Sequence, residues 1–286
     1  MIIRKTALRY ETGKWKEREG WQWRKGQTVQ QFFIDESQVG KEYVTITGPD
    51  VHHIKHVLRM KPGEKIRVST GTQDFFCVIA EIGDEFVQAD LLADEEAVCT
   101  ELPAKITLFQ AVPKGDRMET VIEKAVELGV YEIVPVMMKY CVVKLDEKKA
   151  ANKVRRWQAI AQSAAKQSKR SIIPQVHPVV SYAQALIMIA EHDIRLVPYE
   201  NARGMAAAQE ALASIGPGQR ISVLIGPEGG FAPEEIAAAR ENMQVISLGR
   251  RILRTDTAGI CVMSLLMTAL ETMEETGRMP GSNEIL

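Results

Sequence analysis

Short runs of β-branched and aromatic residues characterise the chain from Val29 to about Cys99. Segments rich in Gly, Pro and Asp separate these runs, as expected for strands joined by turns. The runs predict strands at residues 32–35, 42–47, 65–70, 74–82 and 85–92. One helical stretch, residues 50–60, interrupts them. The pattern therefore predicts a small β-barrel-like domain over residues 29–99, and we expect a polar connector from Ala93 to Pro103.

After Pro103, apolar strands begin to alternate with amphipathic helices. The segment 115–129 has apolar residues at the i, i+3, i+4, i+7, i+8 spacing of one buried helix face. Gly129 then follows as a helix C-terminal residue. A further helix is expected at 147–168, and strands at 105–112, 132–138, 193–199, 221–226 and 245–249. This order predicts an α/β domain with a mostly parallel sheet over residues 104–280.

Composition narrows the class of protein. The 286 residues fit one large or two medium domains, and a net charge of −1 offers no global attraction for nucleic acid. Any RNA must therefore be held by local basic patches. The four scattered cysteines indicate reduced thiols. The apolar segment 261–270 is too short to span a membrane and is expected to be a buried helix. We expect a cytoplasmic protein with no membrane contact.

Residues 1–28 differ from the rest, with three of the four tryptophans and many charged residues but no clear period. Two interpretations compete. The segment is either a basic, aromatic tail that contacts RNA, or a translated leader upstream of a start at Val29, because GUG can initiate translation. We favour the second interpretation and expect poor order in this segment in either case.

The stretch "SVLIGPEGGFAPEEI", residues 222–236, joins a predicted strand to a predicted helix. Phosphate-binding loops at such junctions avoid anions, yet this loop carries Glu228 and the next helix begins with Glu234 and Glu235. The G-x-G-x-x-G and Walker A patterns are both absent. The loop is either a tight turn with a helix start at Pro233 or a grip for a ligand without phosphate, such as S-adenosylmethionine.

A second loop, "SLGRRILRTDTA" (247–258), places three arginines before a helix that Thr255 or Asp256 would cap. These arginines are either solvated side chains or phosphate anchors at the mouth of a site. A third stretch, "KGDRMETVIEKAVELGV" (114–130), places Lys114 and Arg117 after a parallel strand, where loops often line a site.

These three stretches, in this order, resemble the RsmE family of 16S ribosomal RNA uridine-N3 methyltransferases, in the SPOUT superfamily. "VQQFFIDE" (29–36) and "HHIKHVLRM" (52–60) agree, and the resemblance covers residues 29–280. It implies a PUA-like RNA-binding domain, a SPOUT methyltransferase domain with a trefoil knot, and a homodimer. It also implies S-adenosylmethionine as cofactor and 16S rRNA in the small ribosomal subunit as partner.

The resemblance also implies roles for individual residues. The candidates for catalysis are Arg254, Arg117 and, as a proton acceptor, Glu228. The candidates for cofactor binding are Pro198, Glu200, Gly226, Pro227, Glu228, Gly229, Gly230, Leu248, Gly249, Ile252, Leu253, Thr257 and Ala258. The candidates for RNA binding are Gln31, His53, Arg59, Lys114, Lys166, Lys169, Arg170, Arg250 and Arg251.

The sequence departs from the family pattern at several positions. Asp256 replaces a common Glu, Lys166 and Lys169 replace Glu and Gly, and Gln31 replaces an Arg. The two lysines add positive charge where RNA contact is expected. The change at Gln31 puts in doubt a role that an Arg there would have at the reacting base.

The sequence leaves two other functions open: an RNA-binding assembly factor without catalysis, and a methyltransferase that acts on another RNA position. Ribose 2′-O-methyltransferases carry an N-x-x-G-x-x-R signature early in the domain, and "NARGMAA" (201–207) lacks its Arg and lies elsewhere. His52 and His56 have i, i+4 spacing but no H-E-x-x-H motif. We therefore expect no metal.

Overall fold

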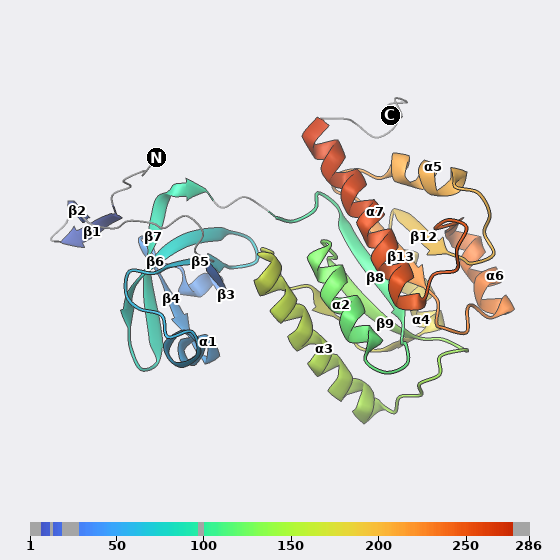
Figure 1. Ribbon diagram of the computed structural model, residues 1–286, viewed down its shortest axis with the longest axis horizontal. Helices are drawn as coiled ribbons and strands as arrows, with labels where there is room; N and C mark the ends of the chain where they lie inside the picture. The colour runs from blue at the N-terminus through green and yellow to red at the C-terminus, as the bar shows by residue number, and fades with distance from the viewer. Residues whose placement is uncertain (1–6, 12–13, 19–28, 97–99, 277–286) are drawn as a thin grey trace. The chain divides into compact units, whose positions relative to one another are not determined.

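The computed structural model describes residues 7–11, 14–18, 29–96 and 100–276, and the chain divides into two units after Thr100 (Figure 1). Within the first 28 residues, β1 (Ala7–Glu11) and β2 (Lys14–Arg18) form an antiparallel pair. The remaining residues of that segment, for which we expected poor order, lie outside the described residues.

The first unit is built on a five-stranded sheet in the order β3-β5-β6-β7-β4. Its outer pair β3–β5 is parallel and the other pairs are antiparallel. The strands are β3 (Gln30–Phe33), β4 (Tyr43–Thr47), β5 (Lys65–Ser69), β6 (Asp74–Ile82) and β7 (Phe86–Glu96). All five predicted strands are confirmed. The polar connector was predicted to start at Ala93, which is wrong, because β7 continues to Glu96 and that residue pairs with Phe75.

The predicted helix of the first unit is also present, in a less regular form. A short 3-10 turn, η1 (Glu36–Gln38), comes first. α1 (Pro49–His52) then runs directly into the π-helical turn η2 (His53–Val57). The helix ends earlier than expected because Arg59 adopts a left-handed conformation, with φ of 52°. Buried Val51 and Ile54 on this segment pack into the core that the strands enclose.

The second unit contains a seven-stranded sheet whose neighbouring strands all run parallel, with the order β10-β9-β8-β13-β12-β14 and β11 beside β9. The strands are β8 (Lys105–Ala111), β9 (Glu132–Met137), β10 (Gln175–Val176), β11 (Val180–Ser181), β12 (Ile194–Pro198), β13 (Arg220–Ile225) and β14 (Gln244–Ile246). The predicted parallel α/β architecture is confirmed. β8 and β13 occupy the middle of the sheet.

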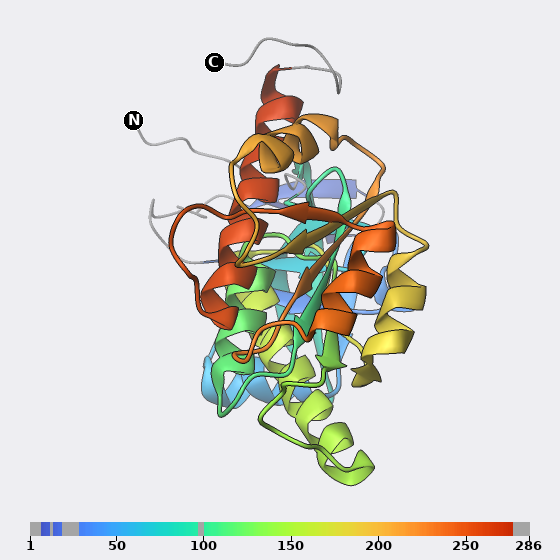
Figure 2. The same ribbon diagram turned by 90° about the vertical axis from the view of Figure 1, so that its right-hand side faces the viewer.

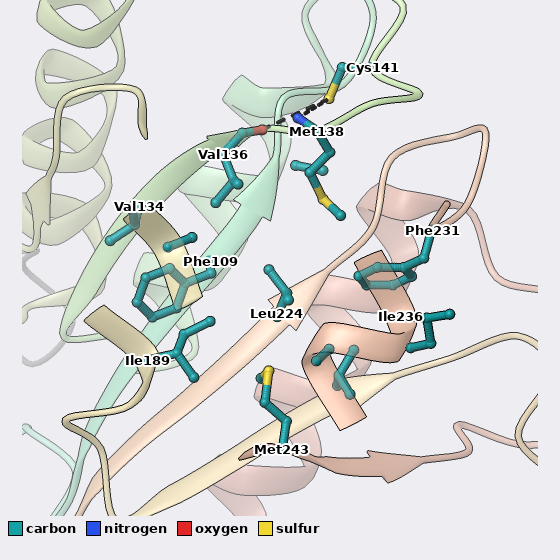
Figure 3. Packing of buried hydrophobic residues seen from close by; sticks show 14 residues of the cluster. Phe109, Val134, Val136, Met138, Cys141, Ile189, Leu224, Phe231, Ile236 and Met243 are labelled. Carbon is teal, nitrogen blue, oxygen red and sulfur yellow. Dashed lines mark hydrogen bonds between the residues drawn. The ribbon is translucent and has the colours of Figure 1, made fainter. Parts of the chain in front are cut away.

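Helices cover both faces of this sheet (Figure 2). They are α2 (Arg117–Glu127), α3 (Glu147–Ser168), α4 (Tyr182–Ile189), α5 (Ala206–Ser214), α6 (Pro233–Asn242) and α7 (Thr255–Thr276). α2 and α7 lie side by side on one face (Figure 1). On the opposite face, Ile189 of α4 and Ile236 of α6 pack with Phe109, Val134 and Leu224 of the strands (Figure 3).

The C-terminal helix α7 is only partly buried, which corrects the expectation of a buried helix. Its inward residues follow helical spacing, namely Gly259, Val262, Met263, Leu266 and Leu270, and they are buried. The residues between them are half-buried or exposed. By length and hydropathy alone this helix would also pass for a membrane span, but here its inward face packs on β8, β13 and α2.

Candidate active site

A cavity of about 520 Å³ lies where the loops after β12, β13 and β14 meet the start of α7. In parallel α/β sheets, ligands bind beyond the carboxyl ends of the strands, and this cavity has that position. Its lining consists of Arg117, Pro198, Tyr199, Glu200, Ile225, Gly226, Pro227, Glu228, Gly229, Gly230, Phe231, Ser247, Leu248, Gly249, Arg251, Ile252, Leu253, Arg254, Thr255 and Ala258.

The glycines after β13 are required by close contacts. A Cβ on Gly229 would lie 2.8 Å from Cβ of Tyr140, and a Cβ on Gly226 would lie 2.7 Å from the ring of Phe231. Gly230 has φ of +73°, and a Cβ there would lie 2.8 Å from Oε1 of Glu200. The amide of Gly230 donates to the carbonyl of Pro227 at 2.9 Å, which closes the turn. The loop therefore brings bare backbone to the cavity wall.

The three glutamates of this stretch are all engaged. Oε1 of Glu228 accepts from the Lys114 amide and from Nη1 of Arg117, both at 2.9 Å. Glu234 pairs with the Lys139 ammonium, and this hydrogen bond holds the pKa of the Glu234 carboxyl below its usual value. Glu235 is buried and accepts from the amides of Lys139 and Ala232 at 2.8 and 2.9 Å.

Two of these glutamates therefore serve local structure. Glu235 accepts from the backbone N–H of Ala232, the residue before α6, and so caps the start of this helix, where Pro233 is the first helical residue as expected. Because Glu234 and Glu235 are held toward Lys139, the acidic helix start faces the loop after β9. Of the three glutamates in this stretch, only Glu228 lines the cavity.

The basic loop after β14 contributes cations to the cavity. Arg251 and Arg254 line it and are exposed, whereas Arg250 is exposed outside the lining. Within the described part of the chain, the Arg254 guanidinium has no ion-pair or hydrogen-bond partner, while Arg117 is held by Glu228. Arg254 is therefore free to meet a negatively charged group at the cavity.

The cavity contains nearly all of the residues predicted for cofactor binding and catalysis. The exception is Thr257, which is exposed and absent from the lining. Thr255, two residues earlier, lines the cavity instead and donates its hydroxyl to the Gly226 carbonyl at 2.7 Å. Sequence reasoning also missed four lining residues that flank the predicted ones, namely Tyr199, Ile225, Phe231 and Ser247. The only sequence feature that could have identified these four residues is that each lies next to a predicted site residue.

Residues predicted to bind RNA have different environments. His53, Arg59 and Lys114 are exposed, and Lys166 and Lys169 are half-buried. Gln31 is buried, with 3% of its surface exposed, so its side chain is not presented to a partner.

Arg170 corrects the prediction that it binds RNA. It is 3% exposed, forms an ion pair with Glu101, and Nη1 donates to the carbonyls of Val126 and Val130 at 3.1 and 2.7 Å. A buried charge needs such partners. Arg170 is therefore a structural residue of the second unit.

The lining is compatible with S-adenosylmethionine. Apolar walls, bare glycine backbone and a flanking carboxylate fit an adenosine with a positively charged sulfur better than a phosphate group. Tyr199 and Phe231 stack edge to face, with ring centroids 6.1 Å apart, and give this wall an aromatic surface. Among the described residues, no cluster of three or more His, Cys, Asp or Glu side chains is arranged to hold a metal ion.

Comparison with known proteins adds an independent line of evidence. The family described as "RNA methyltransferase domain" matches residues 100–267, and "RNA methyltransferase PUA domain" matches residues 46–92. The chain is similar to ribosomal RNA small subunit methyltransferase E of Bacillus subtilis (strain 168). The two are 35% identical over 255 residues, which cover 86% of this chain and 98% of that protein.

Solved structures show the same similarity. A ribosomal RNA small subunit methyltransferase E from Neisseria gonorrhoeae, bound to S-adenosyl methionine, has a TM-score of 0.72 and 31% identity, and the match covers 84% of this chain and 98% of that one. A putative methyltransferase from Legionella pneumophila, in complex with the bound cofactor SAM, has a TM-score of 0.72 and 31% identity, with coverage of 85% and 98%.

Proposed function

The chain belongs to the family of ribosomal RNA small subunit methyltransferases E, and from this membership we propose that it methylates N3 of one uridine in 16S rRNA, with S-adenosylmethionine as the methyl donor. The observation that carries the proposal is the glycine-lined cavity with Arg254 free at its edge. The two solved relatives named above hold this cofactor, which supports its assignment to the cavity.

Uridine N3 carries a proton and becomes a good nucleophile only when that proton leaves. The bound cofactor supplies an electrophilic methyl group on a positively charged sulfur. The chain must then accept the proton, stabilise the negative charge that spreads over the uracil oxygens, and align N3 with the methyl group.

We assign the charge-stabilising role to Arg254, because its guanidinium is exposed at the cavity and unengaged within the described residues. Arg117 is a second cation at the same wall, but its contact with Glu228 makes it first a positioning residue. Both hydrogen bonds to Glu228 fall on Oε1. Oε2 receives none from the described residues, so Glu228 is our candidate proton acceptor.

Within the second unit, we propose that the exposed cations Arg250, Arg251 and Lys114 contact the RNA backbone. Within the first unit, we propose the same role for the exposed residues His53 and Arg59. Such phosphate contacts hold the substrate without reading its sequence. The uridine must be unpaired or flipped, because its Watson–Crick edge reacts. Because the proposed substrate is ribosomal RNA, we propose that the enzyme acts in the cytoplasm.

We also propose a homodimer and a C-terminal knot. The half-exposed apolar face of α7 would be covered by a second copy, and size-exclusion chromatography with light scattering would test this. The knot is supported by the path of the chain. After β14 at the edge of the sheet, the loop returns so that Thr255 contacts Gly226 at the end of central β13.

The test is incubation of the protein with methyl-labelled S-adenosylmethionine and small ribosomal subunits that lack the modification, followed by digestion to nucleosides. We expect label in 3-methyluridine. Label in a ribose-methylated nucleoside would show that the enzyme methylates the sugar and not N3, and would refute the proposed reaction. Cofactor binding without label would indicate another RNA substrate, and the absence of cofactor binding would favour a non-catalytic RNA-binding protein.

A further inference from the structure

A chain of buried hydrogen bonds joins the cofactor loop to the middle of the sheet. Nε2 of Gln110 on β8 lies 2.9 Å from Oγ1 of Thr255 at the start of α7. Oγ1 of Thr255 lies 2.7 Å from the carbonyl oxygen of Gly226, where β13 ends. Gln110 is fully buried and Thr255 is 6% exposed. Three segments far apart in sequence therefore meet through two side chains.

The direction of this chain follows from its chemistry. The Gly226 carbonyl can only accept, so the Thr255 hydroxyl must donate its single proton to it. Oγ1 of Thr255 must then accept from Gln110, which requires the Gln110 amide nitrogen, and not its oxygen, to face Thr255. Nε2 also donates to the Ala111 carbonyl at 3.2 Å, so the amide is fixed by two acceptors.

Gly259, the fifth residue of the C-terminal helix α7, makes room for this arrangement. A Cβ on Gly259 would lie 3.0 Å from Oε1 of Gln110. Glycine destabilises a helix when it lies in the interior, so its presence at position 259 needs a reason. The close approach of the Gln110 amide to α7 supplies one.

We propose that Gln110 and Thr255 are positioning residues for the cofactor, which act by holding the Gly226 carbonyl. The proposal rests on the proposed function, in which this cavity binds S-adenosylmethionine. Gly226 precedes Pro227, which has no N–H, so the carbonyl is the only polar group of the peptide between them. Fixing that carbonyl fixes the orientation in which the loop from Pro227 to Gly230 leaves the sheet.

The test is the affinity for S-adenosylmethionine, measured by isothermal titration calorimetry on the full chain. Thr255→Val keeps the shape and removes the donor, and should weaken binding about tenfold, the effect of one lost buried hydrogen bond. Thr255→Ser keeps the hydroxyl and should restore binding to within about twofold of wild type. Gln110→Met removes the amide donor and should resemble Thr255→Val.

Two comparisons separate this role from general destabilisation. The double variant of Gln110→Met and Thr255→Val should bind about tenfold, not about a hundredfold, more weakly than wild type, because both residues act through one carbonyl. Thr107→Val is the matched control. Thr107 is a buried threonine on the same strand, but its hydroxyl contacts Nε2 of His192 at 3.0 Å. This control should lower the melting temperature and leave cofactor affinity unchanged.

The outcomes distinguish the two proposals. If the wild-type protein does not bind S-adenosylmethionine, the proposed function fails. If wild type binds and Thr255→Val binds equally well, the positioning role is refuted. Should Thr255→Val fail to fold, Gly259→Ala provides the second test, because it displaces the Gln110 amide and leaves both polar groups present. If the single variants Gly259→Ala and Gln110→Met both fold and both bind S-adenosylmethionine as tightly as wild type, the positioning role is likewise refuted.

Discussion

Replacement of Gly230 by alanine tests the assignment of the cofactor cavity most directly. Gly230 has φ of +73°, and an added Cβ would lie 2.8 Å from Oε1 of Glu200. Glu200 is exposed and its carboxylate can swing away, so the lasting cost is the left-handed backbone. That cost is roughly 1–2 kcal/mol for a residue with a Cβ.

If the loop relieves this strain by leaving its binding conformation, cofactor affinity falls by the same free energy. We expect Gly230→Ala to raise the dissociation constant for S-adenosylmethionine about 5- to 30-fold, measured by calorimetry. Gly230→Asn should have a smaller effect, because asparagine tolerates the left-handed region. Gly218→Ala is the control. Gly218 has φ of +78°, no atom within 4 Å of an added Cβ, and no place in the cavity lining.

The control should lose a comparable amount of stability and keep its cofactor affinity. Wild-type affinity in Gly230→Ala, combined with the expected loss of stability, would refute the assignment of this loop to the cofactor. Equal losses of affinity for the Ala and Asn variants would instead identify the Glu200 contact as the cause.

Four further changes probe chemistry and stability. Arg254→Ala should lower kcat at least about tenfold on saturating substrate with little change in cofactor affinity, and an unchanged kcat would remove it from the site. Glu228→Gln should lower kcat at least about tenfold, because the amide cannot accept the N3 proton, and an unchanged kcat would exclude Glu228 as proton acceptor. His192 is buried, and desolvation lowers its pKa below 6.5. Just below pH 6.5 the side chain is therefore protonated in the unfolded chain but still neutral in the folded protein. The free energy of unfolding, from urea titrations, should therefore fall as pH drops through 6.5, and less so in His192→Gln. Glu101→Ala should cost about 3–5 kcal/mol of stability in such titrations by leaving Arg170 buried without its carboxylate, and a loss below about 1 kcal/mol would contradict that interpretation.

The sequence predicted the architecture well because its signals are local. Each short apolar run is enough to identify one strand, and the amphipathic pattern of 115–129 is enough to identify one helix. Gly129 ends that helix with φ of +87°, as expected. The glycine loop and the basic loop were found because each is one continuous stretch. Their meeting at a cavity followed only from the resemblance to a family, since nothing in either stretch encodes the return of the chain after β14.

The errors arise where distant residues decide the environment. Thr255 and Thr257 look equivalent in "RTDTA", but two residues on a helix point about 200° apart. Only the position of Gly226 selects Thr255. Arg170 follows two lysines and resembles part of a basic patch, yet Glu101, 69 residues earlier, holds it inside. The burial of α7 was overestimated because the hydropathy of a helix does not show which of its faces packs against the rest of the chain.

The connection from Gln110 to Thr255 spans 145 positions and has a consequence during synthesis. The β-rich first unit uses contiguous sequence and can fold as soon as it is translated, since domains generally fold as units in N-to-C order. The wall of the cofactor cavity closes only when the last helix has been made and docked on β8. The newly made protein therefore completes its first unit before it can hold a methyl donor, and a chain cut short before Thr255 would keep the first unit but lack the closed cavity.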